Sequence, residues 1–167
     1  NDGMLHGFSA KTGDELLAYV PLGALQNLHL LAARDYSHHY YVDGSPFTGD
    51  ALIDGQWKTL LVGTMGAGGP GFFVLDVTSP ASFAENNATQ LVVMDRTDGS
   101  DPDIGHLFAA PTLDEANAQR ALQITQLNNG RWAVVLGNGY GSANGQPVLL
   151  IQYLDGAREL LKISAIE

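Results

Sequence analysis

A glycine-rich segment, residues 63–71, separates two short apolar runs at residues 60–62 and 72–75. It contains five glycines and one proline in nine residues, a composition that excludes a helix. Each flanking run has the length and the aliphatic or aromatic content of a buried β-strand. The sequence therefore predicts a β-hairpin with an elaborate loop, which we call the first glycine hinge.

The same arrangement recurs later in the chain. Residues 131–137 lead into a second glycine-rich loop, and an apolar run follows at residues 148–151. When Gly63 is aligned with Gly137, Gly71 aligns with Gly145, so this second glycine hinge (residues 137–145) has the same length as the first. A repeat of this kind, built of strands alone, is typical of propeller blades with four strands and insertions.

Composition limits the classes of fold and partner. With 45% hydrophobic and 16% charged residues the chain has the composition of an ordered domain, and its net charge of −10 disfavours nucleic acid and anionic membranes as partners. The absence of cysteine excludes disulfides, thiol catalysis and zinc–thiolate sites. No apolar run reaches the roughly 18 residues that a membrane span needs.

The remaining pattern predicts an all-β fold with one helical insertion. Apolar residues at helical spacing predict a short helix near Ala24–Ala33. An Asn128-Asn129-Gly130 turn predicts a second hairpin, and no alternation of helices and strands suggests a parallel sheet. Further strands are predicted at residues 4–8, 15–20, 35–44, 50–53, 91–94 and 119–127.

The first glycine hinge and the histidines are weak candidates for binding sites. The first glycine hinge lacks the lysine and the following helix that a phosphate loop requires. His38 and His39 lie in a predicted strand, which would direct them to opposite faces and away from a shared metal. His6, His29 and His106 are isolated in the sequence.

The acidic loop at residues 96–103 is the best metal candidate. Asp98, Asp101 and Asp103 offer hard oxygen ligands that suit calcium, but Pro102 interrupts the spacing of an EF-hand loop. No nucleophile motif of the Gly-x-Ser-x-Gly type is present. We therefore predict no catalytic, cofactor-binding or metal-binding residue in this segment.

Several landmarks together resemble one known family. They are NDGMLHGFSAKTGDELLAYVP at the start, the His-Tyr-Tyr-Val-Asp-Gly run that begins at His39, GDALIDGQWKTLLVGTMGAGGPGFFVLDVTSP and GRWAVVLGNGYGS. Their order and spacing are similar to those of the C-terminal β-propeller domain of the type IV pilus PilC/PilY family.

The resemblance implies a modified, quinoprotein-like β-propeller, of which residues 1–167 would form about two to three blades within one domain of a larger protein. It also implies a non-enzymatic protein that supports pilus assembly, opposes pilus retraction and attaches to surfaces. Its location would be the outer membrane, cell surface or pilus tip of a Gram-negative bacterium. Its partners would be other parts of the same protein and pilus components such as minor pilins, with host or surface receptors as further candidates.

Two matters stay open at this point. Family members can carry a calcium loop, so calcium binding elsewhere in the parent protein remains a prediction. The stretch from Gly3 to Gly13 is also somewhat similar to the blade motif of pyrroloquinoline-quinone dehydrogenases. The rival function is therefore an oxidoreductase fragment, although neither a cofactor pocket nor adjacent cysteines are evident in the sequence.

Overall fold

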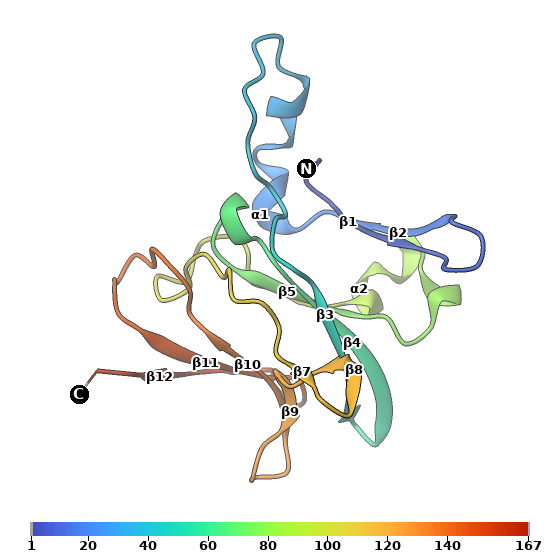
Figure 1. Cartoon of the computed structure of the whole chain (residues 1–167), viewed down its shortest axis with the longest axis vertical. Helices are drawn as coiled ribbons and strands as arrows, with labels where there is room; N and C mark the ends of the chain where they lie inside the picture. The colour runs from blue at the N-terminus through green and yellow to red at the C-terminus, as the bar shows by residue number, and fades with distance from the viewer. Residues whose placement is uncertain (1, 167) are drawn as a thin grey trace.

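Short antiparallel strands dominate the computed structural model, which describes residues 2–166 (Figure 1). Two four-stranded antiparallel sheets form its body, and in each of them strands that follow one another along the chain lie side by side. The first sheet contains β3 (Phe47–Ile53), β4 (Gln56–Thr64), β5 (Phe72–Asp76) and β6 (Val92–Asp95). The second contains β9 (Ile124–Gln126), β10 (Trp132–Gly137), β11 (Val148–Tyr153) and β12 (Leu160–Ser164).

Smaller elements surround these two sheets. The pair β1 (Leu5–Phe8) and β2 (Glu15–Tyr19) forms one hairpin, and the pair β7 (Leu113–Asp114) and β8 (Asn117–Ala121) forms another. The helical elements are α1 (Leu22–Leu25), η1 (Leu28–Ala32), η2 (Gly66–Gly68), η3 (Pro80–Ser82), η4 (Glu85–Asn87) and α2 (Ala88–Leu91). Within residues 2–166, no helix is long and apolar enough to cross a bilayer.

The predicted repeat is confirmed by the topology. The first glycine hinge joins β4 to β5, and the second joins β10 to β11, so each connects the second strand of its sheet to the third. Both pairs are antiparallel, as a hairpin requires. Each four-stranded meander is one blade, and we call the two sheets blade 1 and blade 2.

An apolar core lies between the two blades. Alternate residues of β3 face it, because successive side chains of a strand point to opposite sides. Gly49 of β3 lies so close to blade 2 that a Cβ atom there would be 3.1 Å from the Cβ of Ile124. The buried residues of this core come from both blades and from the loop between them: Phe47, Ala51, Ile53, Leu60, Val62, Phe72, Val74, Ile104, Leu107, Ala121, Ile124, Trp132, Val134, Val148, Leu150 and Leu154.

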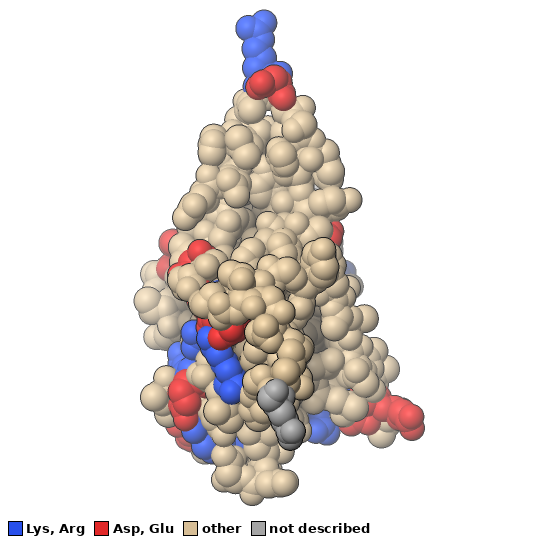
Figure 2. All heavy atoms as spheres, turned by 90° about the vertical axis from the view of Figure 1, so that its left-hand side faces the viewer, with Lys and Arg blue, Asp and Glu red and all other residues tan. Residues whose placement is uncertain are grey.

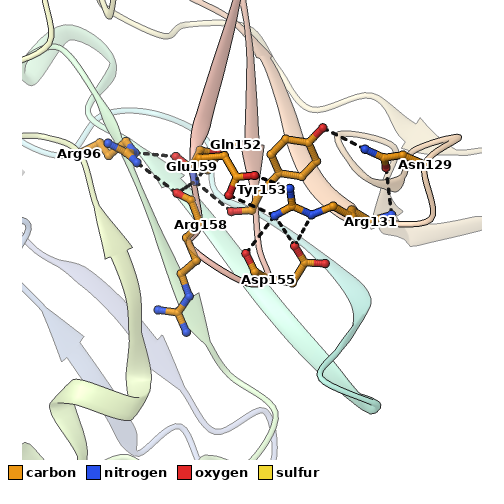
Figure 3. A network of polar contacts seen from close by, with 8 residues as sticks. All are labelled: Arg96, Asn129, Arg131, Gln152, Tyr153, Asp155, Arg158 and Glu159. Atoms are coloured by element: carbon orange, nitrogen blue, oxygen red, sulfur yellow. Dashed lines mark hydrogen bonds and ion pairs between the residues drawn. The ribbon is translucent and has the colours of Figure 1, made fainter.

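A polar network adds specific contacts between the blades (Figure 3). Arg96, next to the end of β6, donates from Nε to Oε1 of Gln152 in β11 at 2.5 Å. Gln152 is fully buried, and its Nε2 donates to the carbonyl oxygen of Arg158 at 2.7 Å. Arg158 in turn donates to the carbonyl oxygen of Val93 in β6 at 2.7 Å. The buried amide thus has partners on both blades, as a buried polar group requires.

Two predicted strands are wrong. Residues 35–44 form no strand, and the N–H groups of Asp43 and Gly44 donate to the carbonyls of Met65 and Thr64 at the end of β4. The stretch 119–127 is broken into β8 and β9. Ala121 and Ile124 are both fully buried in the same core, although residues three apart in a continuous strand would face opposite sides, so the chain must turn between them.

The predicted helix at residues 24–33 is also shorter than expected. The chain forms two separate pieces, α1 and η1, with a break at Gln26 and Asn27. Leu25 and Leu31 remain exposed, so no packed apolar face supports a longer helix. Short helices are marginal in water without such packing, which explains the break. The ends of the predicted domain, Asn1 and Glu167, lie outside the described residues.

Candidate interaction surface

Residues 22–46 extend from one end of blade 1 and are here called the projection (Figure 1). The chain enters it through α1 and η1 and returns without regular structure to β3. Both ends of the projection are attached to blade 1, the entry at the end of β6 and the exit at the first glycine hinge.

The entry to the projection is held by Asp95 at the end of β6. Its Oδ2 accepts from the hydroxyl of Tyr19 at 2.6 Å and from the backbone N–H of Leu22 at 2.8 Å. Its Oδ1 accepts from the N–H of Thr97 at 2.9 Å, and the Thr97 hydroxyl oxygen accepts from the N–H of Gly23 at 2.8 Å. Burial and the neighbouring Asp95 carboxylate raise the pKa of Tyr19, so the phenol stays protonated as a donor.

The exit from the projection packs on the first glycine hinge. A Cβ atom at Gly68 would lie 1.7 Å from the carbonyl oxygen of Tyr41, and one at Gly44 would lie 1.7 Å from Oγ1 of Thr64. The two backbones can therefore meet only where these positions are glycine. Tyr41 is 2% exposed at this junction, and its hydroxyl donates to the carbonyl of Asn27 across the base of the projection at 3.3 Å.

The projection presents aromatic and aliphatic side chains to solvent along its length. Leu25 is 52% and Tyr40 is 53% exposed, and Leu22, Leu31 and Tyr36 are also exposed. Figure 2 shows charged atoms at the tip and on the lower part of the molecule, whereas the flank between them is almost free of charge. Exposed apolar surface of this kind marks sites of interaction with other molecules.

A cleft of about 440 Å³ lies where the projection meets the hinge. Both histidines of the predicted pair line it, together with Asn27, Leu30, Tyr40, Tyr41, Ala67 and Gly68. The expected separation of His38 and His39 onto opposite faces is wrong, because this segment is not a strand. The His38 ring packs edge to face on Tyr40 with ring centres 5.0 Å apart, and the His39 ring lies against Tyr36 at 6.5 Å.

The three aspartates of the acidic loop are not gathered around one point. Asp98 accepts from the N–H and the hydroxyl of Ser100. Asp101 and Asp103 instead share the ammonium group of Lys162, at 2.6 and 2.9 Å. Hydrogen bonds from Asn144 and Lys162 lower the pKa of Asp103. In the described part of the chain no three His, Asp or Glu side chains are grouped to hold a metal, and a calcium ion at this loop would have to displace Lys162.

The three isolated histidines, His6, His29 and His106, make different contacts. His6 is bonded to Asp2 at 2.8 Å and to Glu15, which together raise its pKa, Glu15 having the larger effect. The Nδ1 of His106 lies 2.7 Å from the carbonyl oxygen of Gly66, so this residue contacts the first glycine hinge. His29 is exposed in η1. Lys162 was not foreseen as a partner of the acidic loop, because nothing in the sequence links residues so far apart.

Comparisons with known proteins agree on one family. The model of the PilY1 beta-propeller domain matches residues 1–162. A type IV pilus biogenesis factor PilY1 homolog of Xylella fastidiosa is 45% identical over 99% of this chain and 10% of its own length. Type IV pilus biogenesis factor PilY1 of Pseudomonas aeruginosa UCBPP-PA14 is 41% identical over 90% of this chain and 12% of its own length.

A solved structure supports the same fold. The crystal structure of the Pseudomonas aeruginosa PilY1 C-terminal domain has a TM-score of 0.69 and 36% sequence identity to this chain, covering 98% of this chain and 28% of that one. The predicted all-β propeller fold is therefore confirmed. The chain spans only 10% to 12% of the length of the two relatives named above.

Proposed function

Because the chain belongs to the PilY1 β-propeller family, we propose that it is a non-enzymatic segment of a type IV pilus protein that supports pilus assembly, opposes retraction and helps attachment to surfaces. Its relatives are named as pilus biogenesis factors, which favours a role in the pilus over the oxidoreductase alternative. The same relatives support the proposal of a location at the outer membrane, cell surface or pilus tip of a Gram-negative bacterium.

Within the chain, the projection is the feature that best supports the proposed role. It is fixed to blade 1 at both ends, by Asp95 and by the first glycine hinge, while Leu25, Leu31, Tyr36 and Tyr40 are exposed to solvent. A rigidly based surface with exposed aromatic residues is suited to binding another protein. We assign it to contact with pilus components such as minor pilins, or with another part of the same protein. Host or surface receptors are further candidates.

The experiment alters the projection in the intact protein, in a bacterium that depends on it for piliation. Four exposed side chains, Leu25, Leu31, Tyr36 and Tyr40, are replaced together by serine. We expect fewer surface pili, with recovery when the retraction motor is also removed, because a protein that opposes retraction is then no longer needed. Attachment of cells to a solid surface is measured in parallel.

The matched control replaces four exposed apolar residues elsewhere on the chain by serine: Phe8, Leu113, Leu122 and Tyr140. This control should leave piliation unchanged at equal protein level. If the projection variant is exported at the normal level and piliation, twitching and attachment are all unaltered, the proposed role of the projection is wrong.

A further inference from the structure

A second cleft, of about 430 Å³, lies where the two blades meet, and we call it the junction cleft. Its walls come from β4, from Asp76 at the end of β5, from β6, from the segment between β5 and β6, and from Arg158 in the turn between β11 and β12. Its volume is within the range of small-molecule sites, which are often found where two structural units meet. The hydrogen bond from Arg158 to Val93, part of the network between the blades, lies in this cleft.

One positive charge in the junction cleft has no acidic partner. Arg158 is exposed, and among the described residues its guanidinium group makes one bond, from Nη1 to the carbonyl of Val93. Figure 3 shows its side chain leaving the Arg131 and Gln152 network, with the guanidinium group apart from the acidic side chains. The other cation in the cleft, Lys58, is paired with Asp76 at 2.9 Å. Arg158 therefore has donors left for an anionic ligand.

Uncommitted hydroxyl and amide groups accompany this charge. The side chains of Ser79, Thr89 and Gln90 line the junction cleft and make no hydrogen bond within residues 2–166. Ser and Thr hydroxyls and the Gln amide can each donate and accept. Leu91, Val92 and Val93 add apolar surface. The cleft thus combines one free guanidinium, several neutral donor–acceptor groups and a limited apolar wall.

We propose that the junction cleft binds an acidic carbohydrate, with Arg158 pairing with its carboxylate and Ser79, Thr89 and Gln90 bonding its hydroxyl groups. A sugar acid offers many hydroxyls, one carboxylate and small apolar ring faces, which match the three kinds of group in the cleft. An acidic peptide fits less well, because Arg158 already takes the Val93 carbonyl of the edge strand β6, where a peptide would pair by strand addition.

This inference rests on the attachment role proposed above, and it names acidic carbohydrates as the class of ligand to which the protein would attach. The test measures binding to the purified intact protein, so its outcome is independent of pilus assembly. The probe is a tetramer of galacturonic acid, and its methyl ester, which lacks the charges, is the matched comparison. By calorimetry we expect the acid to bind with a Kd below about 1 mM and the ester to bind more weakly.

Two variants locate the binding. Arg158→Gln should weaken it about tenfold, because a charge-assisted hydrogen bond is lost. Arg120→Gln, which removes an exposed arginine outside the cleft, should leave it unchanged. If hydrogen exchange in β6 and β11 shows that Arg158→Gln is misfolded, the Gln90→Ala variant tests the proposal instead. The Gln90 side chain is exposed and makes no hydrogen bond within the described residues, so its removal should not disturb the fold. It should weaken binding of the sugar acid about threefold.

Three results would overturn the proposal. The first is that the galacturonic acid tetramer shows no binding at a concentration of about 1 mM, which is the weakest affinity expected for this site. The second is equal binding by wild type, Arg158→Gln and, where it is needed, Gln90→Ala. The third is a tetraglutamate peptide that binds as tightly as the sugar acid and loses its affinity in the same variants, which would assign the cleft to acidic peptides.

Discussion

The two glycine hinges have the same length but differ, residue by residue, in what surrounds their glycines. A Cβ atom at Gly63 would lie 2.2 Å from the ring of Phe73, whereas one at the equivalent Gly137 would meet nothing within 4 Å. Gly71 and Gly145 both have positive φ, yet a Cβ atom at Gly71 would lie 2.2 Å from the carbonyl oxygen of Arg96, whereas one at Gly145 would meet nothing within 4 Å. Gly63 and Gly71 thus lie in packed surroundings and Gly137 and Gly145 in open ones, although the second hinge does pack on His106 at Gly139 and Tyr140.

This difference predicts unequal effects of the same substitution. Gly63→Ala should destabilise blade 1 by about 1–3 kcal/mol, because the added methyl group overpacks the Phe73 ring. Gly137→Ala should change the stability of blade 2 by no more than about 0.5 kcal/mol, since it lies in open space. Hydrogen exchange of the β4–β5 and β10–β11 peptides in the intact protein measures both. Equal losses of stability in Gly63→Ala and Gly137→Ala would contradict the difference in packing between the two positions.

At the scale of elements, Arg131 holds the turn between β11 and β12 against the start of β10 (Figure 3). Its Nε donates to Asp155 at 2.7 Å, its Nη1 and Nη2 bond Glu159, and its guanidinium carbon lies 3.7 Å from the centre of the Tyr153 ring. Asn129 donates to the Tyr153 hydroxyl at 3.1 Å, which ties the β9–β10 turn to the same group. The Arg131 side chain thus connects the start of β10 with β11 and with the turn that follows it.

The Arg131 contact also predicts a pH dependence. Hydrogen bonds from Arg131 lower the pKa of Glu159 from its ordinary 4.5 to about 2. A carboxyl whose pKa is lower in the folded state stabilises that state above the ordinary pKa, and the contribution is lost as the pH falls from 4.5 through about 2. Carbon NMR of labelled glutamate should show the low value. In Arg131→Gln the pKa should return toward 4.5, whereas Arg120→Gln should leave it at about 2. A Glu159 that titrates near 4.5 in the wild type would refute the contact.

At the scale of the whole molecule, blade 2 has a second apolar face that points away from the core. The registers of β10, β11 and β12 place Val135, Leu149, Ile151, Leu161 and Ile163 together on it. Leu149, Leu161 and Ile163 are exposed. Because an apolar sheet face is normally buried against another layer, we propose that a neighbouring blade of the propeller packs on this face.

The exposed face predicts how the 167-residue segment behaves when it is made alone. It should self-associate with rising concentration in analytical ultracentrifugation, because a contiguous apolar patch is open to solvent. Replacing Leu161 by Lys and Ile163 by Thr should reduce that association. The same two changes in the intact protein should instead increase hydrogen exchange in β11 and β12. A monomeric wild-type segment at millimolar concentration would show that the face does not drive association.

Local patterns in the sequence were enough to predict most of the blades. The apolar runs beside the two glycine hinges gave β4, β5, β10 and β11, and the turn at residues 128–130 gave the β9–β10 hairpin. The break between Ala121 and Ile124 could not be predicted, because it depends on both residues reaching the core between blades. The contact of Lys162 with Asp101 and Asp103 likewise depends on the fold, because no local sequence pattern predicts a contact between residues so far apart in the chain.

The attachment of the projection determines which bonds would carry a mechanical load. One end is held at Asp95, the last residue of β6, and the other at Thr64 and Met65, where β4 ends. Both strands pair with β5, from opposite sides. Tension applied to the projection would therefore reach blade 1 both through these hydrogen bonds and through the backbone that continues into β3, and β3 would pass part of the load to the apolar core between the blades.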